Sequence, residues 1–217
     1  MITCLGWGLL TAGVLTFGLA VPAAAQAPPT PPEELPEVGA AYRTGKSMFF
    51  GLRKVEVVGT TPSVSLALAP DTAAGGRRII ATIDATTFDS GTDDRDTWVA
   101  ETLAGADETP LIFTSRPVTL AELRAAVSGQ GLEIGGELEL PEGPREVLFT
   151  LSGYDLPSRE GSGTERFIEA WSRTTFDALG IEVPRVGPGG VIASPGDDLE
   201  LWLRVPAAEM VELLPGG

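Results

Sequence analysis

The residues that could perform chemistry in this chain are few, and almost all of them are carboxylates. The 217 residues include no histidine, and the single cysteine is Cys4. Ser-His-Asp and Cys-His catalysis are therefore excluded, because both need an imidazole base. Zinc sites built on imidazole or thiolate are excluded as well, so a metal could meet only oxygen ligands and would be a hard cation. We expect no metal and no cofactor.

Two groups of carboxylates remain. The turn from Asp89 to Asp96 (DSGTDDRD) could gather around Ca²⁺, but its spacing is not that of an EF-hand loop, and we favour a solvated turn in which Arg95 pairs locally. Glu137 and Glu139 share one face of a strand and could in principle act as acid and base. Their alternation with leucines points them toward water if the apolar face lies inside. We therefore predict no catalytic residue and no enzymatic activity.

The charge balance limits the partners. The chain has 30 acidic and 15 basic residues, a net charge of −15. Nucleic-acid binding is improbable, because no basic cluster is large enough to displace counterions from phosphates. Anionic membrane surfaces are poor partners for the same reason.

The N-terminus has the pattern of an export signal. Residues 5–22 are almost entirely apolar and lead into Ala23-Ala24-Ala25, which predicts a signal peptide over 1–25 cleaved near Ala25. The segment Met1-Ile2-Thr3 lacks the usual Lys or Arg, so a retained anchor helix stays open as an alternative. No second apolar run approaches the ~20 residues that span a bilayer. We expect a periplasmic or secreted protein without stable membrane insertion.

The mature chain divides into a proline-rich leader and one domain. Residues 26–38 predict a disordered leader, and residues 39–214 have the length of a single domain. Within the domain the dominant period is two, which is typical of half-buried antiparallel strands. The alternating apolar positions are Val64, Leu66 and Leu68; Ile79, Ala81 and Ile83; Leu138 and Leu140; Val147, Phe149 and Leu151; and Leu199, Leu201, Leu203 and Val205.

Other strand-like runs lie at 47–58, 110–115, 130–134 and 166–173, giving about eight or nine strands, while 95–103 and 119–127 predict one or two short helices. The fold class is all-β, either a sandwich or a barrel, and about eight strands in a barrel leave room for one small ligand. The alternation alone does not separate a filled core from a lined cavity. A small outer-membrane barrel, with its apolar face outward, is a further alternative.

Several segments together resemble the YceI-like family. They are residues 47–59 (SMFFGLRKVEVVG), 80–91 (IATIDATTFDSG) followed by Arg95-Asp96, 110–115 (PLIFTS), 132–140 (LEIGGELEL), 173–177 (RTTFD) and 199–205. They occur in the family's order.

The resemblance implies an extended eight-stranded antiparallel lipocalin-like β-barrel that holds a polyisoprenoid or a similar amphiphilic, quinone-like lipid. It assigns Arg95 and Asp96 a structural role in holding the short helix to the barrel. The apolar lining would comprise Phe113, Leu138, Leu140, Phe149, Leu151, Phe167, Trp171, Leu201 and Leu203. Trp202 lies two residues from Glu200 and from Arg204 on the predicted strand, so alternation places it with them on the polar face.

Two functions from different classes follow. The first is an exported, non-enzymatic lipid-binding protein. The second is an envelope or surface interaction module whose barrel is filled and whose loops make the contacts. Whether two copies form a homodimer is open.

Overall fold

The computed structural model describes residues 29–48, 53–71, 76–157, 163–184 and 193–212. The expected signal peptide lies outside these residues. The described part forms nine strands, three α-helices and one 3₁₀ helix. They are β1 (Gly39–Met48), β2 (Arg53–Thr61), β3 (Val64–Asp71), β4 (Gly76–Ile83), η1 (Ala85–Thr87), α1 (Asp93–Ala104), β5 (Leu111–Ser115), α2 (Leu120–Val127), β6 (Leu132–Glu139), β7 (Arg145–Pro157), β8 (Thr164–Thr175), β9 (Ala193–Pro206) and α3 (Ala207–Glu212).

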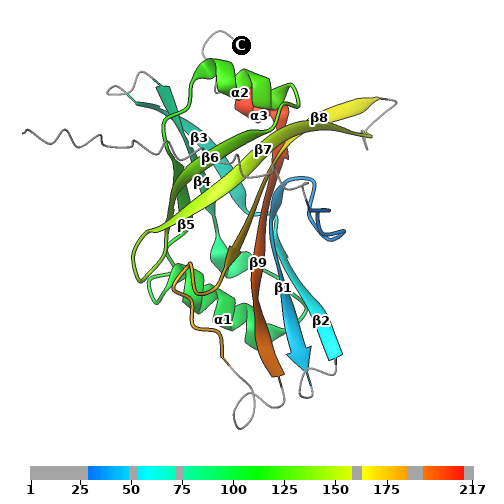
Figure 1. The fold of residues 1–217 in the computed structure, drawn as a ribbon, viewed down its shortest axis with the longest axis vertical. Coiled ribbons are helices and arrows are strands. Elements are labelled where there is room, and N and C mark those ends of the chain that lie inside the picture. Colours follow the sequence, from blue (N-terminus) through cyan, green and yellow to red (C-terminus); the bar gives the residue numbers. More distant parts are fainter. Residues whose placement is uncertain (1–28, 49–52, 72–75, 158–162, 185–192, 213–217) are drawn as a thin grey trace, which may run out of the picture.

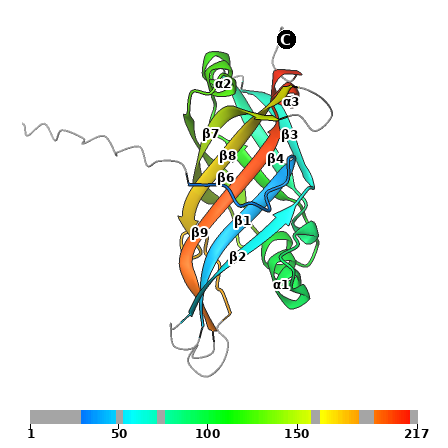
Figure 2. The ribbon, with the colours of Figure 1, turned by 90° about the vertical axis from the view of Figure 1, so that its right-hand side faces the viewer.

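The strands form one antiparallel sheet in the order β2-β1-β9-β8-β7-β6-β5-β4-β3, which curls into a half-barrel (Figures 1 and 2). The expected all-β antiparallel class is confirmed. The sheet has nine strands rather than eight, and the described chain has three α-helices rather than one or two. β2 and β3 are the two ends of the sheet, and no ladder joins them among the described residues. Near this opening, Thr60 of β2 bridges to Asp89, which precedes α1.

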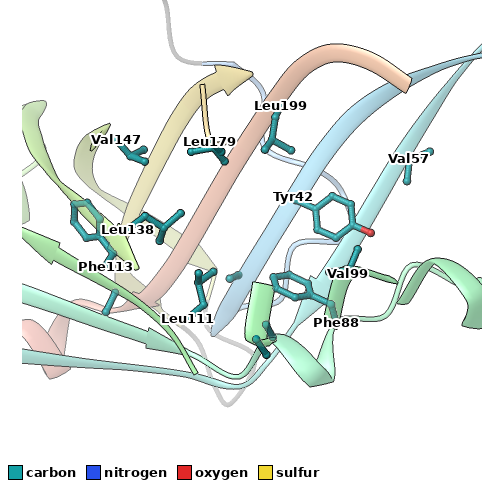
Figure 3. Packing of buried hydrophobic residues seen from close by; sticks show 14 residues of the cluster. Tyr42, Val57, Phe88, Val99, Leu111, Phe113, Leu138, Val147, Leu179 and Leu199 are labelled. Atoms are coloured by element: carbon teal, nitrogen blue, oxygen red, sulfur yellow. The ribbon is translucent and has the colours of Figure 1, made fainter. Parts of the chain in front are cut away.

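The predicted alternation is correct along every strand that it covered. Ala81 pairs with Leu66 and with Phe113, Phe113 pairs with Leu138, and Ala170 pairs with Leu151 and Leu203, so these positions lie on one face of the sheet. The side chains of this face form the core. Figure 3 shows 14 residues of the first of these clusters, with side chains from several strands pointing toward a common interior. The ring of Phe113 meets that of Phe149 edge to face, with centroids 4.9 Å apart.

The strand predicted over 47–58 is wrong as a single element. Its start is the end of β1 and its remainder is most of β2. β1 escaped prediction because its inward positions, Ala40, Tyr42, Thr44 and Lys46, carry no regular apolar pattern.

Two of the helices were predictable from local signals. Thr119 caps α2, where its Oγ1 accepts the N–H of Glu122 at 3.2 Å and its own N–H donates to the Glu122 carboxylate at 2.8 Å. α1 begins two residues before the predicted Arg95 and ends at Ala104, where Gly105 has a φ of 69°. The short helix α3 was not predicted.

The leader is predicted to be disordered over 26–38, whereas residues 29–38 have a defined course across the outer face of the sheet (Figure 2). Leu35 is 5% exposed and packs with Ala41 and Trp202. Arg204 Nη1 donates to the Leu35 carbonyl at 3.3 Å. The proline-rich composition indicated low core-forming capacity, but buried Leu35 and hydrogen bonds from Arg43 to the Thr30 carbonyl and from Arg204 to the Leu35 carbonyl hold this segment on β1 and β9.

Candidate functional site: an apolar cavity with one polar end

A cavity of about 520 Å³ lies inside the curl of the sheet. All nine strands contribute lining residues, as do α1, α3 and the segment 176–184. The volume falls in the range of about 300–1,000 Å³ that is usual for small-molecule sites. Its walls are mainly aliphatic and aromatic side chains, because the inward positions of the strands carry them.

The structure brings most of the predicted lining residues together. The predicted residues that line this cavity are Phe113, Leu138, Phe149, Leu151, Leu201 and Leu203. Leu140, one residue past β6, packs against the same core cluster without lining the cavity.

Phe167 and Trp171 do not line the cavity. They do share a face of β8, as predicted, but Ile168 and Ala170 take the inward positions of that strand. Trp171 instead lies on the outer face beside Trp202, with ring centroids 6.4 Å apart. Parity shows which residues share a face, and the size of an aromatic side chain does not show which face is inside. Trp202 lies outside, as its parity predicted.

Sequence reasoning missed the part of the lining that comes from helices and loops. α1 presents Arg95, Trp98, Val99, Thr102 and Leu103, which follow the i, i+3, i+4, i+7, i+8 spacing of one helix face. That spacing was a usable signal. No periodic signal marks the other contributors, which include Phe176, Leu179, Ile181 and Met210.

Charged and hydroxyl-bearing side chains occur at one end of the cavity, which we call the polar end. It consists of Thr44, Lys46, Thr92, Asp94, Arg95 and Thr102. All six come from β1 or from α1 with its N-cap residue Thr92. Apart from Tyr42 and Trp98, every other described lining residue whose side chain faces inward is apolar. The cavity is therefore amphiphilic, with long apolar walls and a polar end.

Arg95 and Asp96 hold the turn that precedes α1. Arg95 Nε donates to Ser90 Oγ at 2.6 Å and its Nη2 donates to the Ser90 carbonyl at 2.5 Å. Asp96 Oδ1 accepts the N–H of Ser90 at 3.0 Å, and Asp89 Oδ1 accepts the N–H of Gly91 at 2.7 Å. These carboxylates are occupied by the turn itself. In the residues that the structure describes, no three metal-ligating side chains come together.

Tyr42 stands beside this turn and lines the cavity. It is 8% exposed, and its ring meets Phe88 edge to face at 5.4 Å (Figure 3). Burial raises the pKa of Tyr42, and the neighbouring Ser90 hydroxyl and Arg95 guanidinium only partly oppose that shift. Its hydroxyl makes no well-formed hydrogen bond within the described chain.

The outer face of the sheet carries ion pairs. Glu200 lies between two arginines, with Arg173 Nη2 at 2.9 Å and Arg43 Nε at 2.7 Å. Glu169 accepts from Arg204 Nη2 at 2.9 Å and from the Tyr154 hydroxyl at 3.0 Å. Within the described ranges, no helix has the length and hydropathy needed to cross a bilayer.

Comparison with solved structures identifies proteins of the same architecture. BcnA from Burkholderia cenocepacia is 15% identical with a TM-score of 0.50, covering 76% of this chain and 94% of its own. A polyisoprenoid binding domain from Saccharophagus degradans is 13% identical with a TM-score of 0.45, covering 76% and 91%. The Campylobacter jejuni YCEI protein is 12% identical with a TM-score of 0.46, covering 71% and 85%.

No family model and no curated protein matches the sequence. At these identities the likeness to solved structures concerns the fold alone. The chain has a YceI-like fold.

Proposed function

We propose that this protein is an exported, non-enzymatic binding protein that holds a polyisoprenoid or a similar amphiphilic lipid in its cavity. The observation that carries the proposal is the apolar cavity of about 520 Å³ inside the half-barrel, with its polar side chains confined to one end. An apolar cavity of this size favours a hydrophobic ligand, because water gains few hydrogen bonds there.

Hydrophobic burial can supply the affinity without any reactive group. Each buried methylene contributes about 0.8 kcal/mol, so ten such groups contribute roughly 8 kcal/mol before the costs of association. Glu137 and Glu139, the carboxylate pair considered for acid-base chemistry, are exposed on the outer face of β6. This placement supports binding rather than catalysis.

The alternatives from the sequence fit the geometry less well. An interaction module with a filled barrel would not need a continuous cavity. A small outer-membrane barrel, the other alternative, requires an apolar outward face. The outward positions of β8 and β9 instead include Glu169, Arg173, Glu200 and Arg204.

Export is proposed on the apolar N-terminal segment alone. Sequencing the N-terminus of the protein from its native host tests it, and a chain that begins near Gln26 supports cleavage.

The lipid proposal is tested by blocking the cavity. Protein purified from its native host should release a long-chain lipid on organic extraction, identified by mass spectrometry. Ala170→Phe places a ring in the lining and should abolish lipid recovery. Ala67→Phe is the control, because Ala67 is exposed on β3 and lies outside the lining.

Leu201→Trp gives a second block in case Ala170→Phe does not fold, and circular dichroism checks both variants. Repeated recovery of folded wild-type protein without lipid would overturn the proposal. So would equal lipid recovery from folded wild-type and cavity-blocked proteins.

A further inference from the structure

We propose that the polar end of the cavity binds an anionic headgroup, a carboxylate or a phosphate, while the lipid chain extends toward α3. This inference rests on the proposed function and adds to it the chemical class of the headgroup.

The cavity has a direction. Its polar side chains come from β1 and from the segment that starts with Thr92, whereas Val205 and Met210 line it at α3. Figure 1 shows α1 at one end of the molecule and α2 and α3 at the other. An amphiphile gains most when its chain lies along the apolar walls and its headgroup meets the polar side chains.

The charge at the polar end differs from that of the whole chain. The protein has a net charge of −15, but the polar end combines Lys46 and Arg95 with the single carboxylate of Asp94. Among the side chains that line this end, the sum is one net positive charge; the neighbouring Asp96 carboxylate does not line the cavity and accepts the N–H of Ser90. Charge-assisted hydrogen bonds from lysine or arginine to carboxylate or phosphate are among the stronger polar contacts in proteins.

The two cations at this end are not neutralised by salt bridges within the described chain. Six of the other basic side chains do have carboxylate partners, namely Arg43, Arg78, Arg116, Arg166, Arg173 and Arg204. Arg95 uses Nε and Nη2 on Ser90, and its Nη1 makes no hydrogen bond among the described residues. Thr92 makes no capping bond with its side chain, which leaves its hydroxyl able to donate.

Lys46 is the side chain on which the proposal can be tested, because Arg95 also holds the turn before α1. Lys46 faces inward on β1, where it pairs with Val55 of β2. Lys54 is a matched control, because it is the same residue type on the adjacent strand, pairs with Ser47 on the opposite face and does not line the cavity.

The experiment compares ligands that differ only in the headgroup. One pair is a long-chain fatty acid and the alcohol of the same chain, and the other is a polyisoprenyl phosphate and the corresponding polyisoprenol. Dissociation constants are measured for wild-type protein, Lys46→Gln, Lys46→Glu and Lys54→Gln. In wild type the anion should bind about tenfold more tightly than its neutral partner in at least one pair.

The ratio of the dissociation constant of the neutral ligand to that of the anion should fall close to one in Lys46→Gln. It should fall below one in Lys46→Glu and stay at the wild-type value in Lys54→Gln. The pair that shows the preference identifies the headgroup as carboxylate or phosphate. A ratio near one in both pairs for wild type overturns the anionic headgroup while the lipid-binding proposal stands. A preference that survives Lys46→Glu overturns the assignment to the polar end. Absence of binding by all four lipids overturns the proposed function and this inference together.

Discussion

The ring of Tyr42 lies across Gly59, the residue that pairs with it on the adjacent strand β2. A Cβ at position 59 would stand 2.5 Å from Tyr42 Cζ and 2.6 Å from its hydroxyl oxygen. The bare backbone of Gly59 lets the ring lie flat on β2 and meet Phe88. Phe113 uses Gly136 in the same way across β5 and β6, where a Cβ would stand 2.6 Å from Phe113 Cζ. Two aromatic residues of the cavity wall thus depend on glycine partners.

Gly59→Ala should destabilise the protein by about 1–3 kcal/mol, the usual cost of forcing extra volume into a packed site. The added methyl group must displace the Tyr42 ring, which Phe88 and the turn before α1 confine. Urea unfolding measures the change in free energy. Gly45→Ala is the control, because a Cβ at Gly45 meets nothing within 4 Å. Equal losses for the two variants would contradict the packing argument.

Ser115→Ala should cost about 1–3 kcal/mol, the penalty for a buried donor left without a partner. Ser115 is fully buried, and its Oγ accepts the N–H of Ile79 at 2.8 Å at the point where the β4–β5 ladder has ended. Alanine would leave that N–H unsatisfied. Ser65→Ala, at an exposed position of β3, is the matched control and should change the free energy of unfolding little. A stability of Ser115→Ala equal to that of the control would argue that water replaces the hydroxyl.

Alternation predicted which residues share a face of the sheet, because a period of two is a local property of the chain. Phe149 and Leu151, for example, needed no tertiary information to be placed on one face. Phe167 and Trp171 show the limit of this reasoning. Their outward position depends on β9 and on the leader, which meet β8 only in the folded sheet.

The polar end was not predicted, because it too depends on contacts that form only in the folded sheet. Lys46 lies on a strand with little apolar pattern, and Arg95 lies on a helix 49 residues later in the sequence. Their proximity to one cavity follows from the way α1 lies across the curled sheet (Figure 1). Such convergence is set by topology, which local periodicity does not encode.

Leu35→Ala should destabilise the protein by about 1–3 kcal/mol and expose the outer tryptophans to water. Leu35 covers Trp202, which is 2% exposed, and Trp171 packs against the same cluster. Loss of this contact should shift the tryptophan emission to longer wavelength in the folded protein. Glu33→Ala, at an exposed leader position, is the control and should leave the emission unchanged. An unchanged emission in Leu35→Ala would show that the leader does not protect Trp202 in solution.

The two tyrosines of the chain should ionise only at strongly alkaline pH in the folded protein. Burial raises the pKa of Tyr42 above its ordinary value of 10.0, and burial followed by the charge of Glu169 raises that of Tyr154. Since the folded pKa values are the higher ones, the neutral phenols stabilise the fold fully below pH 10. This stabilisation falls as the pH rises from 10 through the folded pKa values, because the unfolded chain loses its protons first.

The ultraviolet absorbance of tyrosinate measures this ionisation, and the same titration in denaturing urea should show an ordinary transition near pH 10. In a Tyr42→Phe background, the remaining signal belongs to Tyr154. Glu169→Gln should then lower the pKa of Tyr154, because it removes the negative charge that opposes ionisation while keeping a group that can accept the Tyr154 hydroxyl. Glu165→Gln is the control, since Glu165 is exposed on the same strand and pairs with Leu156. A Tyr154 transition that does not move in Glu169→Gln would show that burial alone, without Glu169, sets its pKa.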